Sequence, residues 1–115
     1  MKETDIVKEI LVGLAKLRST RLFRNNVGLY RNPNGQVVRF GLCKGSSDLC
    51  GWTTVKITTQ MIGRDVAIFT CCEVKKPKEK PTPEQEAFIS VVQSAGGIAF
   101  VAHSLDEAEN KMMNI

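Results

Sequence analysis

The sequence predicts a mixed α/β fold in which a mixed central β-sheet is flanked by helices. Apolar residues recur at helical spacing near the N-terminus, which predicts an amphipathic helix. A nearly continuous apolar run at residues 66–72 has the composition of a central strand that is covered on both faces. The last third of the 115-residue chain then alternates strand, helix, strand and helix, a length that suits a parallel crossover.

The first predicted helix covers residues 5–18. Its apolar side chains return every three or four residues and form one stripe, at Ile6, Ile10, Leu14 and Leu17. Glu9 falls on the flank of this stripe. Its carboxylate therefore either faces a cleft between the helix and the sheet or lies on the surface.

Two strands are predicted next, at residues 27–30 and 36–42. The sequence Asn-Pro-Asn-Gly at residues 32–35 is typical of a tight turn, so these strands form a β-hairpin. Residues 44–51 are rich in glycine and serine and predict a loop. Residues 52–57 are rich in threonine and valine and predict a further strand.

Residues 65–75 carry the clearest strand pattern in the chain. After a charged loop, Thr82 is placed to cap a helix that has Pro83 in its first turn and ends at a pair of glycines. Residues 98–102 predict a short buried strand, and residues 105–112 predict a final helix. The predicted order is therefore a helix, a run of strands, and then strand–helix–strand–helix.

Basic residues cluster in two stretches of the chain, whose formal net charge is +4. No acidic residue lies between Glu9 and Asp48, and the basic residues of that stretch are Lys16, Arg18, Arg21, Arg24, Arg31, Arg39 and Lys44. The second cluster comprises Lys75, Lys76, Lys78 and Lys80, with Glu79 among them. Such blocks suit a polyanion, most commonly a phosphate backbone, and a solvated basic surface is the alternative.

Several classes of protein are disfavoured by what the sequence lacks. No apolar run approaches the roughly 20 residues of a transmembrane helix, and the polar N-terminus leads into no secretory signal, so we expect a cytoplasmic protein. The spacing of Cys43, Cys50, Cys71 and Cys72 matches no zinc site, which predicts reduced thiols that act as small apolar residues. His103 is the single histidine, so catalysis of the HNH type is disfavoured and a structural role is expected.

Glu73 and Lys75 lie two residues apart at the end of a predicted strand, so their side chains project from the same face. Hydrolysis of a phosphodiester needs a cation and an activated water, and carboxylates bind hard cations such as Mg²⁺. The Val74 carbonyl is a further candidate ligand, and Asp48 lies in the Gly/Ser loop, where small residues allow a substrate backbone to approach. On its own this pattern also fits a surface ion pair.

Together with these residues, several motifs in order along the chain resemble the VRR-NUC domain, a branch of the PD-(D/E)xK nuclease superfamily. The matching segments are Glu9, residues 24–28 (Arg-Asn-Asn-Val-Gly), 39–42 (Arg-Phe-Gly-Leu), 44–49 (Lys-Gly-Ser-Ser-Asp-Leu), 73–75 (Glu-Val-Lys), 82–85 (Thr-Pro-Glu-Gln), and 96–97 (Gly-Gly) with 99–102 (Ala-Phe-Val-Ala). The resemblance implies a restriction-endonuclease-like core of the order α-β-β-β-α-β-α. It also implies a single nuclease domain over residues 1–115.

The resemblance implies a role for each residue of the site. Asp48 and Glu73 bind the divalent metal, Mg²⁺ or Mn²⁺, with help from the Val74 carbonyl, and Lys75 is the catalytic lysine. Gln85 matches the glutamine that this superfamily often places beside its active site, and a local hydrogen bond at the helix start is the alternative for it. Glu9 matches the carboxylate of the first helix, which acts on the metal directly or through a water. Ser47-Asp48 stands where the superfamily usually has Pro-Asp, as is normal for this branch.

The resemblance further implies a stand-alone nuclease of the phage or bacterial type, in the bacterial or phage-infected cytoplasm. It implies an endodeoxyribonuclease for branched DNA such as Holliday junctions, with roles in repair or recombination, acting as a homodimer without an organic cofactor. The candidate DNA contacts are Arg18, Arg21, Arg24, Asn25, Asn26, Lys44, Ser46, Ser47, Lys76 and Lys78. Two alternatives stay open: a catalytically silent DNA-binding module, and a nuclease for flaps, nicked DNA or simple duplex.

Overall fold

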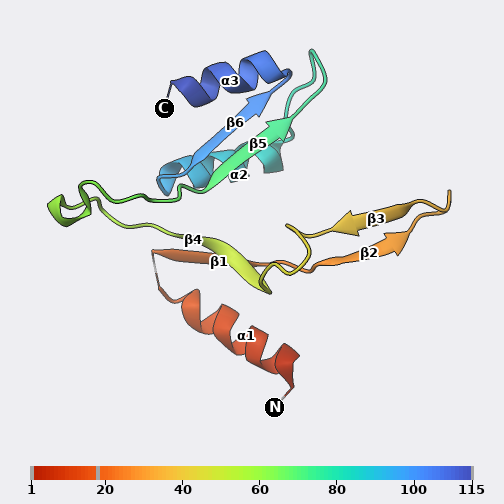
Figure 1. Cartoon of the computed structure of the whole chain (residues 1–115), viewed down its shortest axis with the longest axis horizontal. Helices are drawn as coiled ribbons and strands as arrows, with labels where there is room; N and C mark the ends of the chain where they lie inside the picture. The colour runs from red at the N-terminus through yellow and green to blue at the C-terminus, as the bar shows by residue number, and fades with distance from the viewer. Residues whose placement is uncertain (1, 18, 115) are drawn as a thin grey trace. The chain divides into compact units, whose positions relative to one another are not determined.

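The computed structural model describes residues 2–17 and 19–114. The chain divides into two compact units, Met1–Val55 and Lys56–Ile115, each with its own helical and strand elements (Figure 1). Within the described ranges the fold is mixed α/β, with three α-helices and small sheets. This confirms the predicted fold class and is consistent with a restriction-endonuclease-like fold. The strands of these ranges pair as three two-stranded sheets.

The first unit begins with helix α1 (Glu3–Leu14), which contacts strand β1 (Thr20–Arg24). The helix begins two residues earlier than the predicted range and ends at Leu14. Strand β1 pairs antiparallel with β4 (Leu49–Thr53), and the register places Arg24 opposite Leu49. Strand β4 therefore starts within the segment that was predicted as a loop, directly after Asp48.

Strand β1 was not predicted, because its short sequence carries charged residues at two of five positions and its partner lies far along the chain. The pairing depends on Gly51. A Cβ atom at this position would lie 1.9 Å from the carbonyl oxygen of Arg21, so only glycine lets β4 approach β1 this closely.

The predicted β-hairpin is confirmed by strands β2 (Gly28–Arg31) and β3 (Val37–Phe40), which pair antiparallel. The Asn32 side chain organises the turn, since its Oδ1 accepts hydrogen bonds from the backbone N–H groups of Asn34 (3.0 Å) and Gln36 (2.9 Å). Strand β3 is shorter than the predicted range because the chain turns at Gly41, where φ is +89°.

The second unit contains strand β5 (Thr70–Val74), helix α2 (Pro83–Ser94), strand β6 (Ile98–Ala102) and helix α3 (Leu105–Met113), preceded by a short 3₁₀ helix η1 (Thr59–Met61). Strands β5 and β6 pair in parallel, as a strand–helix–strand crossover predicts, and Glu73 lies opposite Val101. Both α2 and α3 contact β6. The most buried apolar residues among those described lie here, at Val92, Ala99 and Ala102.

Strand β5 starts at Thr70, five residues after the start of the predicted strand. Strand β5 starts this late because its partner β6 is short and begins just after Gly96 and Gly97. The first hydrogen bond between the two strands joins the Ile98 N–H to the Phe69 carbonyl at 2.9 Å. Val66 and Ile68 have no such partner and are 59% and 51% exposed, so the apolar run upstream of Thr70 is not a covered strand. No helix in residues 2–17 and 19–114 has the length and apolar character that a membrane crossing requires.

Candidate functional site

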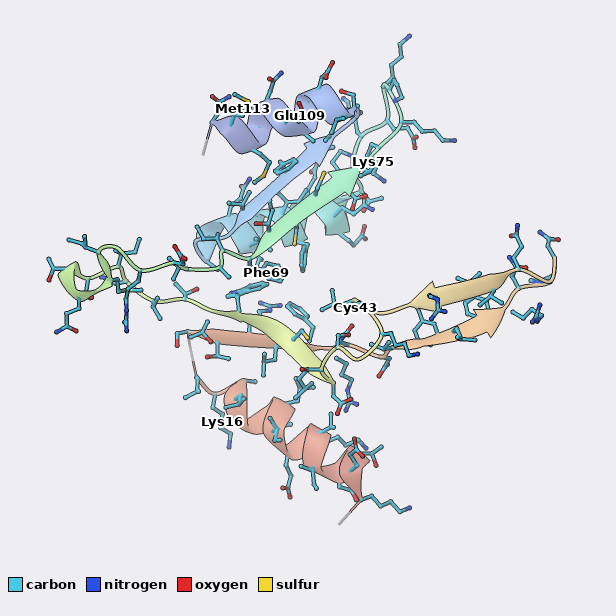
Figure 2. The ribbon with its side chains drawn as sticks, in the orientation of Figure 1. Lys16, Cys43, Phe69, Lys75, Glu109 and Met113 are labelled. Carbon is cyan, nitrogen blue, oxygen red and sulfur yellow. The ribbon has the colours of Figure 1, made fainter. Side chains whose placement is uncertain are left out.

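Glu73 and Lys75 lie on one face at the carboxyl end of β5, as their spacing predicts. Figure 2 labels Lys75, which directly follows the strand. The Lys75 Nζ atom lies 4.0 Å from Oε2 of Glu73, and the two side chains are 17% and 31% exposed, respectively. Each is thus partly shielded by the protein and still open to a ligand. The pair places a cation and a carboxylate side by side at the end of the strand.

The Val74 carbonyl points away from β6. The ladder bonds to β6 use the Phe69 carbonyl and the Lys75 N–H group, which donates to the Ala102 carbonyl at 3.1 Å. Because successive residues of a strand direct their backbone polar groups to opposite edges, the Val74 carbonyl faces the other edge of β5. No strand of the described residues pairs with β5 there, so this oxygen is available as a ligand.

A hollow of about 260 Å³ adjoins Glu73 and the start of α2. The residues that line it are Cys71, Cys72, Glu73, Glu84, Gln85, Phe88 and Ile89. Two residues that the sequence singled out, Glu73 and Gln85, therefore border the same space.

Gln85 makes local hydrogen bonds at the start of α2, which is the alternative role that its position in the sequence allows. Its Oε1 accepts from the Thr82 N–H at 2.9 Å, and its own N–H donates to Oγ1 of Thr82 at 3.2 Å, which forms a capping box at the start of α2. The Nε2 amide group finds no acceptor among the described residues. One end of the side chain thus holds the helix start while the other remains free to donate.

Asp48 lies in the first unit, immediately before β4. Its backbone carbonyl accepts a hydrogen bond from the Asn25 N–H at 2.8 Å, which continues the β1–β4 ladder by one residue pair. The carboxylate is exposed and makes no hydrogen bond or ion pair with any described residue. Asp48 itself is therefore held at its backbone carbonyl, and its carboxylate is unengaged.

The Asn25 side chain connects three points of this loop. Its Nδ2 donates to Ser46 Oγ at 2.7 Å and to the Ser47 carbonyl at 2.9 Å, and its Oδ1 accepts from the Leu42 N–H at 3.0 Å. Asn25 and Ser46 were predicted as DNA contacts, but their side chains are occupied within the protein. Sequence reasoning missed this link, because no local pattern joins residue 25 to residues 42–48.

Glu9 is exposed on α1, and its carboxylate makes no hydrogen bond or ion pair with Asp48 or with any other described residue. Asp48 and Glu9 belong to the first unit, whereas Glu73, Lys75 and Gln85 belong to the second. Among the described residues, no group of three or more His, Cys, Asp or Glu side chains gathers as a ready metal site. The oxygen donors present are of the kind that Mg²⁺ and Mn²⁺ prefer.

The remaining candidate DNA contacts are exposed where the structure describes them: Arg21, Arg24, Asn26, Lys44, Ser47, Lys76 and Lys78. Arg18 lies outside the described residues. The Arg21 guanidinium carbon lies 5.7 Å from the centroid of the Phe23 ring, so the charged group makes a cation–π contact along β1.

The four cysteines are free thiols. Cys50 and Cys71 are half-buried, as expected of thiols that act as small apolar residues, whereas Cys43 and Cys72 are exposed and do not take that role. Burial raises the pKa of the Cys71 thiol above its ordinary value, which disfavours the reactive thiolate at this position.

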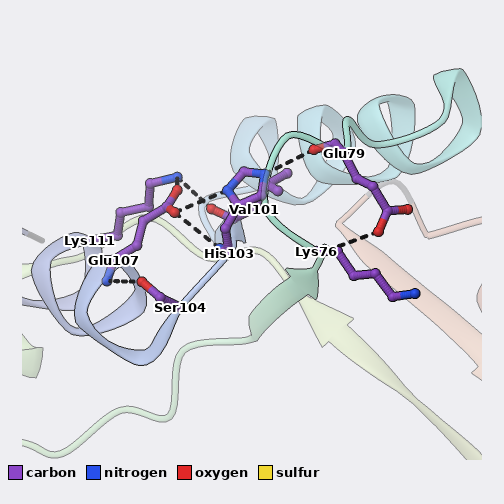
Figure 3. A network of polar contacts seen from close by, with 7 residues as sticks. All are labelled: Lys76, Glu79, Val101, His103, Ser104, Glu107 and Lys111. Atoms are coloured by element: carbon purple, nitrogen blue, oxygen red, sulfur yellow. Dashed lines mark hydrogen bonds and ion pairs between the residues drawn. The ribbon is translucent and has the colours of Figure 1, made fainter.

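His103 joins the loop after β5 to helix α3 (Figure 3). Its Nε2 lies 2.9 Å from the Glu79 carbonyl, and its Nδ1 lies 3.0 Å from Oε2 of Glu107. Lys111 adds an ion pair to Glu107 at 3.1 Å. These contacts give His103 the structural role that was expected. The i,i+4 pairs His103–Glu107 and Glu107–Lys111 are visible in the sequence, but the contact with Glu79 is not.

This network changes two ionisation equilibria. The hydrogen bond to the Glu79 carbonyl, followed by that to Glu107, raises the pKa of His103. Hydrogen bonds from the His103 N–H, the Lys111 ammonium and the His103 ring lower the pKa of Glu107 to about 2. Both ring nitrogens face acceptors, so the geometry favours the imidazolium form of His103.

A family comparison agrees with the motifs described above. The model of the VRR-NUC domain matches residues 15–106 of the chain, a range that includes Asp48, Glu73, Lys75 and Gln85 but not Glu9. No curated protein and no solved structure matches the chain. The VRR-NUC match covers well over half of the 115 residues and implies a nuclease-type function in DNA processing. The chain therefore belongs to the VRR-NUC domain family.

Proposed function

We propose that this protein is a divalent-metal-dependent DNA endonuclease that hydrolyses phosphodiester bonds in branched DNA such as Holliday junctions. The observation that carries the proposal is the pair Glu73 and Lys75 at the end of β5, in a chain of a nuclease family. The Val74 carbonyl between them lies on a strand edge that pairs with no other strand of the described residues. Asp48 supplies the second carboxylate of the catalytic centre.

The metal is Mg²⁺ or Mn²⁺, held by the carboxylates of Asp48 and Glu73 and by the Val74 carbonyl, with Glu9 acting directly or through a water. Mg²⁺ is commonly bound through one or two carboxylates and completes its shell with waters and substrate phosphates. A site of this kind needs no cluster of three acidic or histidine side chains. When bound, the metal polarises the phosphate and lowers the pKa of its water ligand.

Lys75 and Gln85 act on the reacting groups from the protein side. The Lys75 ammonium, held next to Glu73, orients the attacking water and stabilises negative charge as it develops on the phosphate. Gln85 uses its Oε1 to hold the helix start, which leaves its Nε2 hydrogens to donate to a phosphate oxygen or to the water.

The exposed basic side chains bind the DNA backbone. Those on the described residues are Arg21, Arg24, Lys44, Lys76 and Lys78, and Arg18 is proposed to act with them. Exposed Asn26 and Ser47 add uncharged donors. Because each neutralised phosphate releases counterions, binding weakens steeply as the salt concentration rises.

The enzyme acts as a homodimer. A two-fold dimer presents two active sites to the two symmetric strands of a junction. The β2–β3 hairpin supports this proposal, since it exposes a set of large apolar side chains and an isolated hairpin is only marginally stable in water. These exposed residues are Leu29 (56%), Tyr30 (54%), Val37 (52%) and Phe40 (44%). Sedimentation of the full chain at two concentrations measures the oligomeric state.

The test incubates the purified chain with a labelled four-way junction and a matched linear duplex, each with Mg²⁺, Mn²⁺ or EDTA. Lys75→Ala is compared with Lys56→Ala, which removes the same charge from an exposed position outside the proposed site. Paired, metal-dependent cuts on the junction that are lost only in Lys75→Ala are the expected result.

Other outcomes reassign the function. Equal cleavage of junction and duplex, or preferred cleavage of flaps or nicked DNA in the same competition, keeps the nuclease and rejects the junction specificity. Tight junction binding without cleavage in either metal rejects the enzyme and identifies a catalytically silent DNA-binding module.

A further inference from the structure

We infer that Asn25 is a positioning residue that pre-organises the loop carrying Asp48, rather than a residue that contacts DNA. The inference rests on the proposed role of Asp48 as a metal ligand. It is supported by four hydrogen bonds between Asn25 and the loop, three donated and one accepted by Asn25, all within the first unit.

The backbone of Asn25 sets the position of Asp48 along the sheet. The β1–β4 register pairs Arg24 with Leu49, so the next antiparallel pair is Asn25 with Asp48, and the 2.8 Å bond from Asn25 N–H to the Asp48 carbonyl forms there. Residues that lie directly opposite one another in a ladder share a face. A slip of one residue would move the Asp48 carboxylate to the other face of the sheet.

The side chain of Asn25 fixes the rest of the loop. Its Nδ2 donates one hydrogen to Ser46 Oγ and the other to the Ser47 carbonyl, and its Oδ1 accepts from the Leu42 N–H. A side-chain amide has two donor hydrogens, so no hydrogen of Asn25 is left for a phosphate oxygen. This is why the structure favours a positioning role over DNA contact.

Ser46 transmits the constraint to the turn in front of Asp48. Its Oγ accepts from Asn25 and donates to the Cys43 carbonyl at 2.7 Å, and its N–H donates to the same carbonyl at 3.0 Å. Gly45 lies inside this turn with φ at +86°. The loop from Leu42 to Asp48 is therefore held together by hydrogen bonds to the side-chain amide of Asn25.

Pre-organisation of this kind acts on metal affinity. A loop that is already ordered loses less conformational entropy when its carboxylate binds a cation. Residues that orient metal ligands typically change metal affinity or activity by roughly 10- to 100-fold when they are removed. Asn25→Ala is therefore expected to weaken Mn²⁺ binding by a factor in this range.

The experiment measures Mn²⁺ binding to the full chain without DNA, by the electron paramagnetic resonance signal of free Mn²⁺. Asn25→Ala is compared with Asn32→Ala, a matched control that loses three side-chain hydrogen bonds at the tip of the hairpin. Asp48→Asn reports whether Asp48 is a ligand at all. Ser46→Ala, which removes one partner of Asn25, gives a second reading if Asn25→Ala does not fold.

The expected result is weaker Mn²⁺ binding in Asn25→Ala, a smaller loss in Ser46→Ala, and wild-type affinity in Asn32→Ala. The Mn²⁺ concentration for half-maximal cleavage should rise in Asn25→Ala by the same factor. Two results overturn the inference and leave the proposed site intact. In the first, Asn25→Ala and Asn32→Ala lose Mn²⁺ affinity equally. In the second, Asn25→Ala keeps the wild-type Mn²⁺ affinity while Asp48→Asn binds Mn²⁺ weakly. Wild-type Mn²⁺ affinity in Asp48→Asn rejects the site itself, and the positioning role with it.

Discussion

The Lys75 ammonium nitrogen lies 4.0 Å from Oε2 of Glu73, at the carboxyl end of β5. The distance is at the outer limit of an ion pair, and both groups retain some contact with solvent. Both side chains are less exposed than a typical surface pair, at 17% and 31%, so removing either one leaves the other partly buried without its partner. Each variant of this pair is therefore checked for folding before its cleavage is compared with that of the wild type.

Lys75→Ala is expected to lower the rate of DNA cleavage by about 10²- to 10³-fold, as the loss of one transition-state donor typically does. Lys75→Arg keeps the charge but replaces a compact ammonium with a planar fork, so we expect an intermediate rate. Single-turnover cleavage measures the rates, and urea unfolding checks the fold. Wild-type cleavage by Lys75→Ala would show that this lysine has no part in the chemistry.

Gln85→Glu and Gln85→Ala are expected to separate the two roles of Gln85. Glutamate keeps an oxygen to accept from Thr82 N–H, so the capping box survives, but it has no amide hydrogens to donate. Gln85→Glu should therefore fold as stably as wild type and cleave more slowly. Gln85→Ala should also lose about 0.5–1 kcal/mol of stability. Thermal unfolding and cleavage assays measure both effects, and unchanged cleavage in Gln85→Glu would leave only the capping role.

The His103 network is expected to make stability depend on pH. The pKa of His103 is raised in the folded protein, so its contribution is complete below the ordinary value of 6.5 and is lost as the pH rises through the folded pKa. The pKa of Glu107 is lowered to about 2, so its contribution is present above the ordinary value of 4.5 and is lost as the pH falls towards 2. The network therefore stabilises most between pH 4.5 and 6.5.

His103→Gln tests this window. Glutamine can donate to the Glu79 carbonyl but cannot become charged. The stability difference between wild type and His103→Gln should therefore shrink as the pH rises from about 6 to about 8.5, the range in which a histidine with a raised pKa loses its proton. Urea unfolding at each pH measures the difference. A difference that stays constant over this range would mean that the pKa of His103 is the same in the folded and the unfolded protein.

Gly51→Ala is expected to destabilise the first unit. The added Cβ would lie 1.9 Å from the Arg21 carbonyl oxygen, so β4 must shift away from β1. Overpacking of this kind typically costs about 1–3 kcal/mol. Hydrogen exchange of the β1 and β4 amides measures the change, with Gly13→Ala as the control, since nothing lies within 4 Å of a Cβ at Gly13. Unchanged protection of β1 and β4 in Gly51→Ala would contradict the close pairing.

Features of the fold that depend on local chemistry could be predicted from the sequence. Thr82 and Ser104 cap α2 and α3 through short-range hydrogen bonds, and the Asn32 turn closes the hairpin in the same way. Glu73 and Lys75 share a face because strand geometry alone requires it.

Features that depend on distant partners could not be predicted. Strand β1 exists through its pairing with β4, and β5 is short because β6 is short. The role of Asn25 depends on residues 17 to 23 positions further along the chain, which no local periodicity encodes. Its sequence context, Arg24-Asn25-Asn26, suggested a phosphate contact because polar side chains in a basic segment look alike before their partners are known.

The proposed function requires that Asp48 and Glu73 serve one metal-dependent cleavage reaction. The most direct test measures cleavage of a labelled four-way junction over a range of Mn²⁺ concentrations, for Asp48→Asn, Glu73→Gln and the double variant. If the two carboxylates serve the same metal, each single variant should lose cleavage, and the double variant should be little slower than either, because residues that act as a unit are not additive. Wild-type cleavage by either single variant, or fully additive losses in the double variant, would contradict the claim.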